Sequence, residues 1–152
     1  MPNTDVPDDY VTNNRKSRER LLNLVSKLSD HSLKRIANHG WTIAMTLAHM
    51  AFYDNYRLEQ LRRWEQTGFN EVKHDTDAIN SGLRPLLEGV DGGTATRCVV
   101  SAAQAIDQQI ANLNSELANE IEQNGRALDR SRHRNEHLDE IEHALTSETQ
   151  GT

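Results

Sequence analysis

The stretch that decides the fold is WTIAMTLAHMAFYD, residues 41–54. Its apolar side chains recur every three or four residues along two faces of a helix, which contain Met45 and Leu47 respectively. A helix that is apolar on two sides is buried in a protein interior. We therefore expect this segment to form the most deeply buried part of a helical domain, with His49 inside it.

Glycine and proline divide the rest of the chain around this helix. Proline breaks helices, and glycine costs about 1 kcal/mol in a helix interior, so long stretches without either are helix candidates. Together with the apolar spacing, they predict helices over residues 9–29, 42–66, 95–124 and 129–146. No alternating β-branched run indicates a strand. The sequence thus predicts an all-α protein, a four-helix bundle.

The connections carry information on how these helices are ordered. A partly helical loop, residues 30–40, joins the first two helices, and a short turn at Gly125 joins the last two. Helices two and three are separated by an irregular crossover that contains Pro85 and five glycines. A connection that long can cross the bundle, which allows the two middle helices to run parallel.

Length and charge set further bounds. A chain of 152 residues supports one core, which we expect over residues 10–147, between a polar leader (1–9) and a polar tail (148–152). The net charge of −6 argues against nucleic acid or anionic membranes as partners. No apolar run reaches the roughly 20 residues that cross a bilayer, and a secretory signal is not apparent.

Cys98 is the single cysteine of the chain. One cysteine excludes a disulfide framework and a cysteine-built zinc site, and it fits a reducing cytoplasm. We therefore expect a cytoplasmic protein. Beside Val99 and Val100, Cys98 is expected to be an inert core residue rather than a nucleophile.

Three histidines are candidate metal ligands. His133 and His137 lie one helical turn apart on the predicted last helix, so their side chains point the same way. His49 lies on the buried second helix, and the three imidazoles together form a set that suits Zn²⁺, Ni²⁺, Fe²⁺ or Cu²⁺ and leaves a position open. The ordinary alternatives are a solvated pair on the last helix and a core histidine bonded to a carbonyl.

Two segments carry a family resemblance. Residues 41–54 resemble the second-helix signature of the DinB/YfiT-like superfamily, in which Trp and Ser or Thr open the helix and an apolar-Ala-His motif follows. Residues 133–142, HRNEHLDEIE, resemble the C-terminal HxxxH helix of that family, and residues 77–80, DAIN, match less specifically. The resemblance extends over residues 10–145.

The resemblance implies a fold, a metal and an assembly. The implied fold is an up-down-down-up four-helix bundle with a long crossover between helices two and three. The implied cofactor is a divalent metal (Zn, Ni or Fe) held by His49, His133 and His137. Members of the family are often dimeric, so a homodimer is implied as well.

The family also implies an activity. Some relatives are thiol-dependent transferases or isomerases that use bacillithiol, mycothiol or glutathione. The resemblance therefore implies a metal-dependent S-transferase, isomerase or hydrolase acting on a small molecule, in which the metal lowers the pKa of a bound thiol or water. The alternative is a non-catalytic metal-binding or dimerising bundle.

Charged residues near the histidines have open roles. Asp54, five residues after His49, either orients a ligand imidazole or is an exposed carboxylate. Arg134 either recognises an anionic substrate or forms a salt bridge within the bundle. Glu136 and Glu140 are expected on the solvated side of the last helix. Because ligation requires neutral imidazoles, metal binding is expected to weaken below about pH 6.5.

The sequence also offers two alternative binding sites and a prediction of the oligomeric state. A di-iron carboxylate site would use the Glu71/His74 and Glu140/His143 pairs, but these lie in the crossover and on another face of the last helix. Basic clusters at residues 15–20 and 126–134 offer a nucleic-acid surface, but solvated faces explain them more simply. The apolar stripe along the predicted third helix predicts a homodimer, unless helices one and four cover it.

Overall fold

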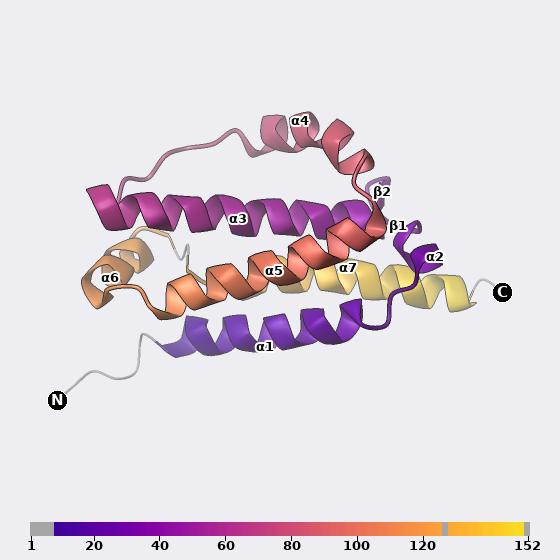
Figure 1. Ribbon diagram of the computed structural model, residues 1–152, viewed down its shortest axis with the longest axis horizontal. Helices are drawn as coiled ribbons and strands as arrows, with labels where there is room; N and C mark the ends of the chain where they lie inside the picture. The colour runs from indigo at the N-terminus through magenta and orange to yellow at the C-terminus, as the bar shows by residue number, and fades with distance from the viewer. Residues whose placement is uncertain (1–7, 126–127, 151–152) are drawn as a thin grey trace.

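The computed structural model describes residues 8–125 and 128–150, which are mostly helical with one small two-stranded sheet (Figure 1). The all-α class is therefore confirmed. In chain order the elements are α1 (Asp8–Val25), α2 (Asp30–Leu33), β1 (Ile36–Asn38), β2 (Trp41–Thr42), α3 (Ile43–Thr67), α4 (Thr76–Glu88), α5 (Gly92–Ala111), α6 (Ser115–Gln123) and α7 (Ser131–Gln150).

The four long helices, α1, α3, α5 and α7, lie side by side along the length of the molecule (Figure 1). The most extensive contact joins α3 to α5, while α1 packs against α5 and α7, and α7 also contacts α3. As predicted, the first half of α3 is the most buried segment, and Ile43 and Leu47 are fully enclosed there. None of the helices in the described residues combines the length and apolar character of a membrane span.

The ends of the chain differ in part from the expected leader and tail. Of the leader expected over residues 1–9, residues 1–7 lie outside the described residues, while Asp8 and Asp9 form the start of α1. The tail expected over 148–152 is helical through Gln150, and residues 151–152 lie outside the described residues.

The single helix predicted over residues 95–124 is wrong, because the chain breaks it into α5 and α6. Asn112 closes α5, and the side chain of Asn114 accepts hydrogen bonds from the backbone N–H groups of Glu116 and Leu117 at the start of α6. Asparagine is a favoured cap because its side chain replaces the missing backbone acceptor. The apolar spacing continues across the break and hides it.

The crossover is not irregular, since it contains α4 and runs alongside α3 (Figure 1). The Asp75 carboxylate caps α4 by accepting from the N–H of Ala78. Pro85 lies near the end of α4, where its missing N–H removes only one helical hydrogen bond. Because the prediction took glycine and proline as the ends of helices, it missed α4, which contains Pro85.

A β-hairpin with a two-residue turn precedes α3, in a segment where no strand was expected. Asn38 pairs with Trp41 across a turn in which His39 has φ 52° and Gly40 φ 78°. Two positive φ values in a row are the conformation that two-residue hairpin turns require, and glycine adopts it freely. Thr42 ends the hairpin and caps α3 by accepting from the N–H of Met45.

The apolar stripe of α5 is covered within the chain. Its members Val99, Ala103 and Ile106 are almost fully buried, and α1 and α3 are the helices packed against them. The stripe therefore offers no argument for a partner chain. Cys98 on the same helix is exposed, so its prediction as a core residue is wrong.

An ionic cluster, Asp54, Asp107, Arg130 and Arg134, is buried among the long helices. The Arg134 guanidinium on α7 is 2% exposed and donates to Asp54 on α3 at 3.3 Å and to both carboxylate oxygens of Asp107 on α5 at 3.1 Å. It also donates to the Ser17 hydroxyl on α1 at 3.0 Å. One side chain thus links α7 to the other three long helices.

The cluster is satisfied on its other sides as well. Arg130 Nε donates to Asp54 at 2.9 Å, and Arg18 on α1 donates to Asp107 at 2.7 Å. Buried charges are tolerated only when paired and hydrogen-bonded, and removal of one partner leaves the others uncompensated.

Arg134→Ala is expected to reduce the free energy of unfolding by about 3–5 kcal/mol, because it leaves two buried carboxylates short of a partner. The matched control is Arg132→Ala on the same helix, where the exposed 3.7 Å pair with Glu136 contributes at most about 1 kcal/mol. Urea denaturation of the metal-free protein measures both changes. Equal effects of the two substitutions would contradict the structural role of Arg134.

Candidate metal site

The three histidines predicted as ligands come together. His49 is on the first half of α3, and His133 and His137 are on α7, which packs against it. One nitrogen of each ring lies within 4.8 Å of the corresponding atoms of the other two. The ring centroids of His133 and His137 are 4.6 Å apart, and that of His49 lies 4.9 Å from His137 and 5.6 Å from His133.

Burial keeps all three imidazoles neutral. Desolvation, with a smaller contribution from His137, lowers the pKa of His49 to about 4. Desolvation also lowers the pKa of His133 to about 3, assisted by the charges of His137 and Arg130. Burial lowers the pKa of His137 too, although Glu140 opposes that shift. Neutral imidazole is the form that binds a metal ion.

The nitrogen atoms fit a metal. His133 Nε2 and His137 Nε2 face one another at 3.1 Å. Within the described residues, His49 Nδ1 is buried with no hydrogen-bond partner, which is costly for a polar atom. A divalent ion of the zinc, nickel or iron class would use such nitrogen donors, and three protein ligands leave it an open position.

Glu140 also belongs to the site, although it was expected on the solvated side of the last helix. Its Oε1 lies 2.8 Å from His137 Nδ1, and its Oε2 accepts a hydrogen bond from Asn38 of β1. The signal in the sequence was the i,i+3 spacing from His137, which puts the two side chains on one face of a helix.

A pocket of about 260 Å³ opens beside the histidines. Residues from β1, β2, α3, α4 and α7 line it: Asn38, His39, Trp41, Thr46, His49, Asn80, His137 and Glu140. The Trp41 and Tyr53 rings pack edge-on against His49. The Tyr53 hydroxyl donates to Asn80 Oδ1 at 2.6 Å and so ties α4 to α3 at the edge of the pocket.

The structure places Asp54 and Arg134 in the ionic cluster. Asp54 is 5% exposed, so the alternative of an exposed carboxylate is wrong, and its hydrogen bonds are to Arg130 and Arg134. Arg134 forms the salt bridge within the bundle that was one of its two interpretations. Glu136 is exposed beside Arg132, as expected.

The rival sites are not assembled. In the part of the chain that the structure describes, the Glu71/His74 and Glu140/His143 pairs form no group of metal ligands. His74 instead lies 3.1 Å from the Tyr56 hydroxyl. In the second basic cluster Arg130 and Arg134 are buried and Arg132 is exposed, while Arg126 lies outside the described residues.

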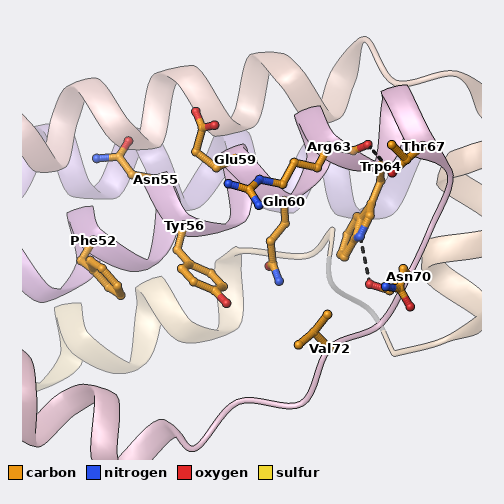
Figure 2. A pocket seen from close by; sticks show the side chains of 10 residues that line it. All are labelled: Phe52, Asn55, Tyr56, Glu59, Gln60, Arg63, Trp64, Thr67, Asn70 and Val72. Carbon is orange, nitrogen blue, oxygen red and sulfur yellow. Dashed lines mark hydrogen bonds between the residues drawn. The ribbon is translucent and has the colours of Figure 1, made fainter.

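A larger groove, of about 610 Å³, follows α3 away from the histidines (Figure 2). Figure 2 shows Phe52, Tyr56 and Gln60 along one wall and Val72 of the crossover opposite them. It contains none of the three histidines, so size alone would select the wrong cavity for the metal chemistry.

The metal-free protein is expected to lose stability on acidification from about pH 6.5 towards pH 4. In the unfolded chain the imidazoles take up protons near pH 6.5, whereas folded His49 and His133 have pKa values of about 4 and 3. Protonation therefore favours the unfolded chain, so the free energy of unfolding is at its full value above pH 6.5 and falls as the pH drops below it. Urea denaturation across this range measures the slope. His133→Asn should flatten it and His143→Asn, an exposed control, should not. Identical slopes for both would contradict the burial argument.

Comparison with known proteins agrees with this geometry. No curated protein and no solved structure matches the chain at a significant level. The sequence profile of the DinB superfamily matches residues 14–146, which include all three histidines and nearly all of the four long helices. The chain therefore belongs to the DinB superfamily.

Proposed function

We propose that this protein is a divalent-metal-dependent enzyme in which His49, His133 and His137 hold the ion. The convergence of their nitrogens to within 4.8 Å beside a pocket carries the proposal. When bound, the metal would supply Lewis-acid activation of a thiol or a water at neutral pH. Transfer or isomerisation with a low-molecular-weight thiol such as bacillithiol, mycothiol or glutathione, or hydrolysis, are the reaction classes we propose.

The remaining pocket residues exclude water and orient a small-molecule substrate. Trp41 covers one edge of His49. Because Asn80 Oδ1 accepts from Tyr53, its NH₂ group is left to donate to a substrate oxygen in the pocket. Glu140 is engaged by Asn38 and His137, so it does not close the coordination sphere as a fourth ligand. An open position beside a pocket favours catalysis over a structural metal.

The proposal also includes the up-down-down-up order of the long helices and the homodimer, both of which the family resemblance implies. The course of the ribbon in Figure 1, where α3 and α5 run one way and α1 and α7 the other, supports the up-down-down-up order of the bundle. Cytoplasmic localisation is proposed on the single cysteine. The homodimer also stays a prediction.

His49→Ala is expected to remove most of the bound metal while the helix content is retained, because alanine favours a helix and the ionic cluster is untouched. Metal analysis of protein purified without an affinity tag, with circular dichroism, measures both. His143→Ala is the control for an exposed histidine. Equal metal content in wild type and His49→Ala would defeat the site, and no turnover with any thiol of a panel would leave the non-catalytic alternative.

Sedimentation at high protein concentration tests the assembly. A species of twice 17.2 kDa is expected for the homodimer. A single 17.2 kDa species at every concentration would reject it.

A further inference from the structure

The hairpin turn fixes the orientation of the Asn38 amide. The backbone N–H of His39, held at φ 52°, donates to Asn38 Oδ1 at 2.9 Å. The amide oxygen is therefore occupied on the turn side, and the NH₂ group is the end that faces α7. That group donates to Glu140 Oε2 at 2.5 Å.

Glu140 passes this orientation on to His137. Its second oxygen, Oε1, lies 2.8 Å from His137 Nδ1. The contact is not aligned as a hydrogen bond. At this distance, however, a lone pair on Nδ1 would face a lone pair of the carboxylate oxygen and be repelled by it, so the contact favours a proton on Nδ1. In the neutral ring the lone pair is then on Nε2, the atom that lies 3.1 Å from His133 Nε2 inside the three-histidine group.

We propose that Glu140 is a positioning residue, which, with Asn38 and the His39 turn, locks His137 in the Nδ1–H tautomer with Nε2 aimed at the metal position. The proposal rests on the metal site proposed above. A carboxylate behind a ligating imidazole fixes the ring and raises its basicity, and its loss typically weakens metal binding by about 10–100-fold.

The tautomer is tested in the metal-free protein. Long-range ¹H–¹⁵N correlation spectra at neutral pH distinguish Nδ1–H from Nε2–H for each histidine. His137 is expected as Nδ1–H in wild type and as a mixture, or as Nε2–H, in Glu140→Leu. Wild-type His137 protonated on Nε2 would overturn the proposal whether or not the protein binds metal, so this result is separate from failure of the proposed function.

Zinc affinity is tested next, by competition with a chromophoric chelator. Glu140→Leu is expected to raise the zinc Kd by about 10–100-fold. Glu140→Gln should lose less, because it keeps one acceptor oxygen while placing an NH₂ group against Asn38 or His137. Asn38→Ala should also raise the Kd, since it frees Glu140 to turn away. Glu136→Gln, an exposed carboxylate one turn earlier, is the matched control and should leave the Kd unchanged.

Thermal melts of the metal-free variants separate positioning from folding. Glu140→Leu with an unchanged melting temperature, a shifted tautomer and a weakened zinc Kd supports the proposal. An unchanged Kd in Glu140→Leu, or the same loss in Glu136→Gln, overturns it.

Discussion

The structure depends on how one buried guanidinium is paired. Arg134 reaches Ser17, Asp54 and Asp107, which belong to the other three long helices. The hydrophobic effect is non-directional, whereas a buried ion pair is directional and is lost if a helix turns about its axis. The cluster therefore sets the rotation of α7 relative to α1, α3 and α5.

That rotation determines where the histidines point. Along α7, Arg134, Leu138 and Ile141 form the buried face, and His133, His137 and Glu140 form the face beside it. With Arg134 held by its carboxylates, the neighbouring face is turned to His49 on α3. The ionic cluster therefore also orients the ligands of the candidate metal site, although it contains none of the three histidines.

The histidines and the long helices could be predicted because both follow from local periodicity: His133 and His137 are one turn apart, and His49 lies in an apolar stripe. What was missed depends on capping and tertiary pairing. The apolar spacing runs through the break at Asn112, and Pro85 is tolerated late in α4. A salt bridge of Arg134 within the bundle was one of its two interpretations, but its partners Asp54 and Asp107 were not identified. Both carboxylates lie among apolar core positions where an unpaired charge would not be tolerated.

The hydrogen bond between Tyr53 and Asn80 joins two kinds of chain segment at the site. The ligands come from α3 and α7, whose positions are set by the core. Asn80 comes from α4, which packs on α3 from outside. Long surface connections tolerate insertion and replacement far better than core helices do. The crossover can therefore diverge in length and sequence, and alter what the pocket accepts, while the histidines that hold the ion stay as they are.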